Sequence, residues 1–306
     1  MAIVRRSKHS QDFSLILTTM WSNFHTHSKY CDGKGELMEY CLAAKKLALF
    51  SLGFSSHAPV PFQSAWNMKP EVLSNYLDVI QQHRQESQDL EIYKGLEIDF
   101  IPGIISPNDF RDRLDYTIGS IHFVDALPDG HHWEIDGPHP AFLEGFKTIF
   151  KNDIRATVTR YFELTRQMVT TSCPTLVGHL DKVKIQNTGD KLFNESDSWY
   201  REEIEKTLDL IQDAGCIVEV NTRGLYQKKS QTPYPSPWIL ELLLQKGIPV
   251  TLSSDAHYPD DLINQFAETA LLLRKLGFKK ITTLKDGEWT QVDFNENGIA
   301  LEHSRI

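Results

Sequence analysis

The stretch W-S-N-F-H-T-H, residues 21–27, is a short β-rich run that ends in two histidines. His25 and His27 are two residues apart, so in an extended chain their side chains point to the same side, roughly 6–7 Å apart. The stretch V-T-L-S-S-D-A-H, residues 250–257, repeats this spacing with Asp255 and His257. Mixed imidazole and carboxylate ligands suit Zn, Mn or Fe better than Mg or Ca. The two stretches therefore predict a metal site, although an isolated H-x-H is equally typical of partly exposed loop histidines.

Between these stretches, β-rich runs alternate with helical patterns, which predicts repeated βα units and a parallel sheet. We expect strands at 21–25, 51–56, 91–97, 116–121, 175–178, 216–221 and 248–253. We expect helices at 36–50, 71–87, 154–171, 198–214, 237–246 and 260–276, with the glycines at 53, 215, 247 and 277 as helix C-caps. Seven strands in one chain of this length favour a single α/β barrel.

Every predicted strand ends in a polar residue. The residues at these ends are His25 with His27, His57, Glu97, His122, His179, Asn221, and Asp255 with His257. Barrel enzymes gather their chemistry at the C-terminal ends of the strands, so these side chains are predicted to meet. Any one of them is as well explained by a structural histidine, but six together favour a site. The other six histidines, at 9, 83, 131, 132, 139 and 303, fall outside this pattern.

A carboxylate ends the third predicted strand, in G-L-E-I-D. Glu97 has two oxygens that can bridge neighbouring ions, which a neutral imidazole cannot do. Asp99 has the same parity along the strand and is the competing candidate for this role.

Composition excludes several classes of partner. The formal charge of −9 argues against broad binding of nucleic acid. Four cysteines without a C-x-x-C spacing predict neither a disulfide framework nor a zinc ribbon, which favours a reducing cytoplasm. No apolar run approaches the ~18 residues that span a bilayer. Residues 1–19 lack periodicity and are predicted to be a dispensable extension, with Met20 as an alternative start, before one domain at 20–306.

The ordered motifs H-T-H, D-G, S-x-H-A-P, G-x-E-x-D, G-S-x-H-F, G-H-x-D and S-D-A-H resemble the polymerase and histidinol phosphatase (PHP) superfamily. G-L-E-I-D, G-S-I-H-F-V and E-V-N-T-R-G look like its histidinol-phosphatase branch. The resemblance implies a distorted seven-stranded TIM-like barrel with two to three divalent metal ions. It also implies hydrolysis of histidinol phosphate, a step of histidine biosynthesis.

Carried over residue by residue, the resemblance implies three groups of ligands. They are His25, His27, Glu97 and Asp255 for the first ion, a shared Glu97 with His122 and His179 for the second, and Asp32, His57 and His257 for the third. Some members of the superfamily have a histidine in place of Asp32, so this ligand leaves the third ion's identity open. An oxygen ligand at this position would tolerate manganese better than an all-nitrogen set.

The expected mechanism is attack of a hydroxide shared between ions on the phosphorus of a small phosphate monoester. Glu97, Asp255 and His257 are the expected catalytic residues, with Asp181 as a candidate general acid. Arg223 is predicted to bind the phosphate, or else to be an ordinary surface arginine, and Lys182 and Lys184 are weaker alternatives.

The long segment at 124–140 follows His122 and is rich in glycine, proline and acids. It is predicted to cover the mouth of the site and to contact the substrate through Trp133, Glu134 or Asp136. A solvated loop without a specific role is the alternative.

Three other functions compete with this hypothesis. The ion cluster would serve a nucleotide or another small phosphoester equally well, because it recognises the phosphoryl group. A non-catalytic metal-binding barrel is a second alternative, and an amidohydrolase-like barrel, which would need a bridging lysine at a strand end, is a third. The tail after residue 278 predicts a hairpin around D-G that caps the barrel or pairs with another subunit, so the oligomeric state stays open.

Overall fold

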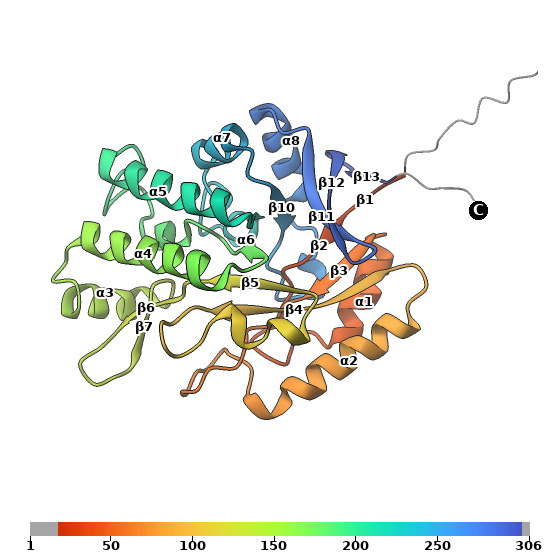
Figure 1. Cartoon of the computed structure of the whole chain (residues 1–306), viewed down its shortest axis with the longest axis horizontal. Helices are drawn as coiled ribbons and strands as arrows, with labels where there is room; N and C mark the ends of the chain where they lie inside the picture. The colour runs from red at the N-terminus through yellow and green to blue at the C-terminus, as the bar shows by residue number, and fades with distance from the viewer. Residues whose placement is uncertain (1–17, 302–306) are drawn as a thin grey trace, which may run out of the picture.

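Seven parallel strands form the centre of the computed structural model, which describes residues 18–301 (Figure 1). Their spatial order is β10-β9-β8-β5-β4-β3-β2. They are β2 (Ser22–Asn23), β3 (Ser51–Phe54), β4 (Glu91–Asp99), β5 (Tyr116–Ser120), β8 (Leu176–Val177), β9 (Ile217–Asn221) and β10 (Val250–Ser253). A parallel bridge between Thr26 and Ala256 joins the two edges of the sheet. The strands therefore form the nearly closed seven-stranded barrel that the sequence predicted.

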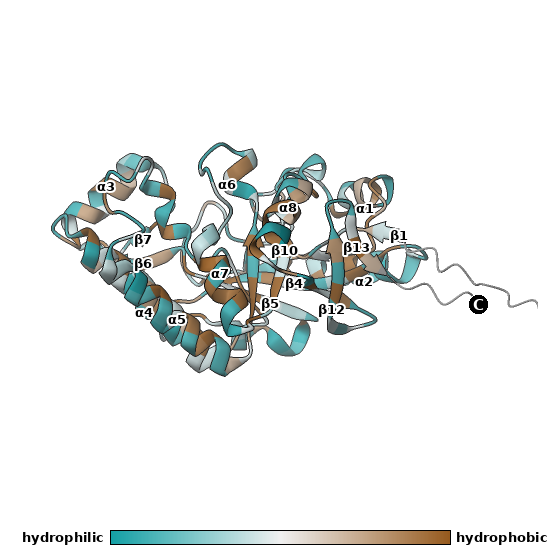
Figure 2. Ribbon diagram, turned by 90° about the horizontal axis from the view of Figure 1, so that it is seen from above, coloured by the Kyte–Doolittle hydropathy of each residue, from teal (hydrophilic) through white to brown (hydrophobic). Residues whose placement is uncertain are grey.

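Helices surround these strands in Figure 1. They are α1 (Leu37–Lys46), α2 (Leu73–Glu86), α3 (His139–Thr148), α4 (Ile154–Ser172), α5 (Ser198–Ala214), α6 (Arg223–Tyr226), α7 (Pro237–Lys246) and α8 (Phe266–Leu276). Short 3₁₀ turns are η1 (Pro70–Val72), η2 (Pro107–Asp109), η3 (Arg111–Arg113), η4 (Lys182–Gln186) and η5 (Pro259–Asp261). In Figure 2 hydrophobic and hydrophilic residues alternate along the helices, as expected where one stripe packs on the barrel. No helix among residues 18–301 is both long and apolar enough to cross a membrane.

Three of the four predicted glycine caps are confirmed. Gly215, Gly247 and Gly277 end α5, α7 and α8 in the left-handed conformation. The prediction for Gly53 is wrong, because helix α1 ends earlier, at Lys46, and Gly53 lies inside strand β3. Helix α8 also starts later than predicted, at Phe266, since the 3₁₀ turn η5 and the left-handed Gln265 precede it.

The Tyr116 side chain leaves no room for a Cβ atom at position 53 of strand β3. A Cβ atom added to Gly53 would lie 2.3 Å from the Tyr116 hydroxyl oxygen, and one added to Gly95 would lie 2.3 Å from its ring. The hydroxyl donates a hydrogen bond to the carbonyl oxygen of Phe24 (2.6 Å). Gly95 has the same strand parity as Glu97, so this buried ring packs on the face of the sheet that carries the site.

We expect Gly95→Ala to destabilise the protein by about 1–3 kcal/mol or more, because the new methyl group overlaps the buried Tyr116 ring. Gly189→Ala is the matched control. Nothing lies within 4 Å of its added Cβ, and its φ of +72° should cost only about 1 kcal/mol. Urea denaturation measures both free energies of unfolding. Equal losses for the two variants would contradict the packing argument.

A separate antiparallel sheet closes the other end of the barrel. It consists of β1 (Thr18–Met20), β13 (Gly298–Leu301), β12 (Glu288–Asn295) and β11 (Lys280–Lys285), in that order. The predicted hairpin around D-G is confirmed as β11 and β12. Trp289 packs edge-on against Phe24, with ring centroids 5.0 Å apart, so this sheet covers the barrel interior. Of the predicted extension, residues 1–17 lie outside the described residues, and Thr18 and Thr19 belong to strand β1.

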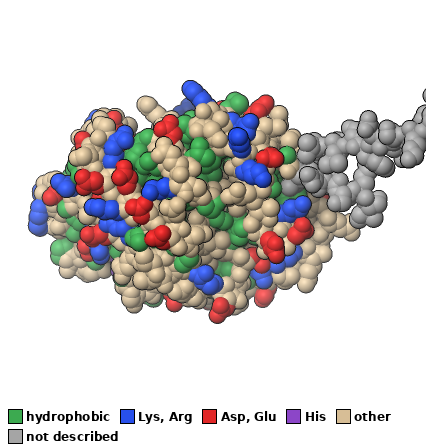
Figure 3. Space-filling model, turned by 45° about the horizontal axis from the view of Figure 1, so that its top comes forward, with side chains coloured by type: hydrophobic (Ala, Val, Ile, Leu, Met, Phe, Trp, Pro, Cys, Tyr) green, Lys and Arg blue, Asp and Glu red, His purple; other side chains and the backbone are tan. Residues whose placement is uncertain are grey.

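The long segment after His122 is folded rather than a simple loop. It forms a hairpin of β6 (Phe123–Ala126) and β7 (His132–Glu134), and α3 follows. On the face seen in Figure 3, acidic and basic side chains are intermingled, with no extended basic patch.

Candidate metal centre

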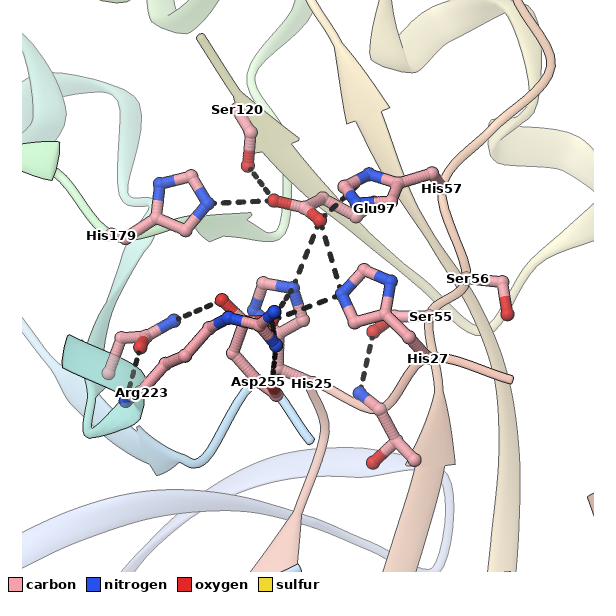
Figure 4. A network of polar contacts seen from close by, with 12 residues as sticks. His25, His27, Ser55, Ser56, His57, Glu97, Ser120, His179, Arg223 and Asp255 are labelled. Carbon is pink, nitrogen blue, oxygen red and sulfur yellow. Dashed lines mark hydrogen bonds and ion pairs between the residues drawn. The ribbon is translucent and has the colours of Figure 1, made fainter. Parts of the chain in front are cut away.

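Six histidines and three carboxylates meet where the strands of the barrel end. Figure 4 shows Glu97 with the imidazoles of His25, His27, His57 and His179 around it. All nine predicted metal ligands, together with Asp99, make up four groups. In each group, one nitrogen or oxygen atom from every residue lies within 4.8 Å of the others. Asp32 enters from the turn after His27, and the other eight lie within or directly after barrel strands.

Glu97 occupies the middle of this cluster. Its Oε2 lies 3.2 Å from His25 Nε2, 3.4 Å from His27 Nε2 and 3.1 Å from His57 Nδ1. Its Oε1 lies 2.8 Å from His179 Nε2 and accepts a hydrogen bond from Ser120 Oγ at 2.7 Å. The two oxygens of one carboxylate thus face different sets of imidazoles, which is the geometry that a bridging ligand needs.

Three groups of side chains correspond to the three ligand sets that the family resemblance implied. One contains His25, His27 and Asp255, with Glu97 Oε2 beside both imidazoles. Another contains Glu97, His122 and His179. The third contains Asp32, His57 and His257, together with His27.

Buried polar atoms in this cluster lack hydrogen-bond partners in the described chain. They include His25 Nε2, His27 Nε2, His57 Nδ1 and Asp32 Oδ1. A buried polar atom without a partner is unfavourable, so several pointing at one place indicate ligands for an ion. The residues therefore fit a cluster of divalent metal ions.

The balance of charge supports the same conclusion. Glu97, Asp99, Glu219 and Asp255 are almost completely buried around the cluster. Among residues 18–301, only one lysine and one arginine contact the cluster. Lys182 Nζ lies 3.4 Å from His122 Nε2, and Arg223 Nη1 lies 3.3 Å from Asp255 Oδ1. Burying several carboxylates together is costly unless positive charge compensates them. Protonated imidazoles supply part of this charge in the structure, and metal ions would supply it with the imidazoles neutral.

The imidazoles of the cluster differ in the direction of their pKa shifts. Burial lowers the pKa of His25, His27 and His122, but neighbouring acidic groups outweigh it and raise the pKa of His25 well above its usual value, that of His27 to about 10 and that of His122 to about 9. These three imidazoles would release a proton on binding a metal ion.

Burial lowers the pKa of His179 and lowers that of His257 to about 4, with His27 and Arg223 also acting on His257. These imidazoles are therefore neutral at pH 7, the form that binds a metal ion. Burial alone would raise the pKa of Asp255, but Arg223 and His25 outweigh it and hold this pKa well below its usual range.

Two buried acids contact the predicted ligands in a way that the sequence analysis did not predict. Glu219 Oε1 lies 2.5 Å from His25 Nδ1, and its Oε2 accepts the amide hydrogen of His179 at 2.8 Å. Asp99, which was considered only as a bridge, lies 2.8 Å from His122 Nδ1. Such acids fix the tautomer and the direction of a metal-binding imidazole. The signal for Glu219 was an acid inside the apolar run I-V-E-V-N, with the same parity as Asn221.

We expect Glu219→Gln to weaken metal affinity or activity by about 10- to 100-fold, because His25 loses the carboxylate that orients it. Competition with a chelator measures the affinity. Glu203→Gln is the control, because Glu203 is a buried acid that pairs with Arg166 (2.8 Å) on the outer helices. If metal affinity is the same in both variants, Glu219 does not position a ligand.

Basic side chains lie beside the cluster and line the pocket above it. Arg223, at the start of α6, donates from Nη1 to the carbonyl oxygen of Asp255 (2.7 Å) and contacts His257 Nδ1. Lys182 pairs with Asp136 at 3.0 Å. Arg223, Lys182, Asp136 and Glu134 all line the pocket, as expected for residues near a substrate.

The structure contradicts three of the predicted roles of residues in the site, those of Trp133, Asp181 and Lys184. Trp133 is buried, donates its indole hydrogen to the Ala141 carbonyl oxygen and packs against Phe142, so it cannot contact a substrate. Strand alternation places it on the opposite side of β7 from the pocket. Asp181 does not line the pocket either, because its carboxylate accepts hydrogen bonds from Lys184 Nζ (2.8 Å) and the Ser236 amide (2.9 Å). Lys184 is excluded as a phosphate-binding residue, because its Nζ donates to Asp181 and to the Pro233 carbonyl oxygen and it does not line the pocket.

Comparison with known proteins agrees with this geometry. The family model described as "PHP domain" matches residues 23–223. A "Probable histidinol-phosphatase" of Deinococcus radiodurans is 30% identical over 268 residues, which cover 84% of this chain and 94% of that protein. The "Histidinol-phosphatase" of Bacillus subtilis is 27% identical over 258 residues, covering 78% and 94%.

A solved structure shows the same fold. It is the histidinol phosphate phosphatase of Lactococcus lactis complexed with zinc, L-histidinol and phosphate. Its TM-score is 0.65 at 19% identity, with 93% of this chain and 100% of that chain covered.

Proposed function

This chain belongs to the PHP domain family, and we propose that it is a metal-dependent phosphatase that hydrolyses L-histidinol phosphate to L-histidinol and phosphate. The observation that carries this proposal is the convergence of eight potential metal ligands around a ninth, Glu97, below a pocket with basic residues. The curated relatives support histidinol phosphate as the substrate.

The residues of the cluster would hold two to three divalent ions such as Zn, Mn or Fe. Bound ions of this kind neutralise phosphoryl oxygens and activate a water molecule as the nucleophile. Glu97, Asp255 and His257 belong to the catalytic set as ligands. Glu219 and Asp99 keep the imidazoles of His25 and His122 in position.

Basic residues on the pocket wall would bind the phosphoryl group. The Arg223 guanidinium is held by Asp255, which leaves further N–H donors for phosphate oxygens. Burial lowers the pKa of Lys182, but Asp136, Asp255 and Glu97 outweigh this effect and raise it above its ordinary value. Lys182 therefore stays protonated, and Asp136 fixes its position beside the cluster.

Metal analysis combined with steady-state hydrolysis of histidinol phosphate and a panel of monoesters tests the proposal. We expect more than one ion per chain and the highest kcat/KM for histidinol phosphate. A nucleotide or sugar phosphate as the best substrate would overturn the substrate assignment. A protein without bound metal and without phosphatase activity would instead be a non-catalytic barrel.

A further inference from the structure

One carboxylate in the pocket is not neutralised by any basic or imidazole side chain. Five carboxylates line the pocket, namely Asp32, Glu97, Glu134, Asp136 and Asp255. Four of them lie within 4 Å of a histidine, lysine or arginine nitrogen. Among residues 18–301, Glu134 has no such partner, and its carboxylate accepts one hydrogen bond, from Trp66 Nε1 to Oε1 at 2.8 Å.

Trp66 fixes this carboxylate next to the metal centre. Its ring lies edge-on to His57, with ring centroids 4.4 Å apart, and 5.3 Å from His122. Trp66 also stacks on the Phe123 ring, with ring centroids 5.2 Å apart and an angle of 12° between the ring planes. Trp66 is thus held between Phe123 and two metal-binding imidazoles. Trp66 therefore connects Glu134 to the imidazoles of His57 and His122.

The backbone beside Glu134 is also fixed. A Cβ atom added to Gly137 would lie 3.0 Å from Glu134 Oε2, so the two residues are in close contact. Gln186 donates a hydrogen bond to the Gly137 carbonyl oxygen at 2.8 Å and ties this turn to η4. The second carboxylate oxygen of Glu134, Oε2, therefore lies at the edge of the pocket beside a turn that this hydrogen bond holds in place.

We propose that Glu134, positioned by Trp66, binds the positive charge of the leaving alcohol and thereby selects phosphate monoesters that carry an amine. This inference rests on the proposed function, because it takes the phosphoryl end to lie at the metal centre. Arg223 and Lys182 lie at that end and repel a substrate cation, whereas Glu134 attracts it. The two effects fix the direction in which a bipolar substrate enters.

The test compares Glu134→Gln with the wild-type protein on two pairs of esters. Histidinol phosphate is paired with p-nitrophenyl phosphate, and phosphoethanolamine with ethyl phosphate. We expect kcat/KM for the amine-bearing ester of each pair to fall by about 10- to 100-fold, mainly through KM, because a charge-assisted hydrogen bond is lost. The neutral esters should change less than about threefold. Trp66→Phe, which removes only the N–H donor and part of the ring, should give a smaller fall in the same ratio.

Glu195→Gln is a matched control. Its carboxylate also accepts an indole hydrogen, from Trp238 Nε1 at 2.6 Å, but Glu195 does not line this pocket. We expect it to leave both ratios unchanged.

The possible results separate the inference from the proposed function. An unchanged ratio in Glu134→Gln, or an equal fall for amine-bearing and neutral esters, overturns the role of Glu134. If histidinol phosphate is a poor substrate but the phosphoethanolamine to ethyl phosphate ratio falls in Glu134→Gln, the inference stands and the histidinol phosphatase assignment fails. If histidinol phosphate is the best substrate and Glu134→Gln leaves the ratio of kcat/KM for amine-bearing and neutral esters unchanged, the histidinol phosphatase assignment stands and the role of Glu134 fails.

Discussion

Asp255→Asn is expected to lower the phosphatase rate by roughly a thousandfold and to reduce the metal content of the purified protein. Asp255 Oδ1 lies 3.2 Å from His27 Nε2 and 3.8 Å from His25 Nε2, so the carboxylate and both imidazoles would hold the same ion. Asparagine is nearly the same size but carries no negative charge. Hydrolysis rate and elemental analysis of the same preparation measure the two effects together. His27→Ala should give the same pair of losses.

The backbone at Asp255 makes this substitution informative. Asp255 has a left-handed φ of 52°, a conformation that asparagine tolerates well. Asp286→Asn is the matched control, because Asp286 has nearly the same φ, 51°, in the turn between β11 and β12. This variant should keep its activity and its metal. Full activity in Asp255→Asn would show that the cluster is not the reaction centre.

Removing the metal ions with a chelator is expected to abolish activity, again by roughly a thousandfold, and to lower Tm by about 5–10 °C. Without ions, the carboxylates of Glu97, Asp99, Glu219 and Asp255 repel one another in a buried site. Zn, Mn or Fe should restore both properties. Thermal unfolding with and without chelator, followed by rate measurements after each metal is added back, gives the result.

The same treatment of Asp255→Asn is the control for the chelator. We expect a smaller change in Tm in this variant, because it has already lost part of its metal affinity and one buried charge. A chelated protein that retains its rate while elemental analysis finds no bound metal would exclude a metal-dependent mechanism.

Much of the metal site was predictable because its signals are local in the sequence. Except for Asp32, each predicted ligand lies near the C-terminal end of a short apolar strand, and the strand ends of a parallel barrel meet at one face. The alternation of strand and helix patterns predicted the barrel, and the family resemblance implied the division of the ligands into three groups. By contrast, helix α3 and the hairpin of β6 and β7 were missed, since glycine, proline and acidic residues in that segment are typical of loops.

The amino-acid sequence by itself determined the barrel and the side chains that gather at its end, because strand periodicity and strand termini depend on neighbouring residues. The tertiary structure decided which side chains reach the pocket. Trp66 and Glu134 are 68 residues apart and meet there, whereas Trp133, next to Glu134, is buried on the opposite side of β7. Glu219 and His25, 194 residues apart, form their contact in the same way. A side chain's partner depends on the packing of distant segments, which no local pattern specifies.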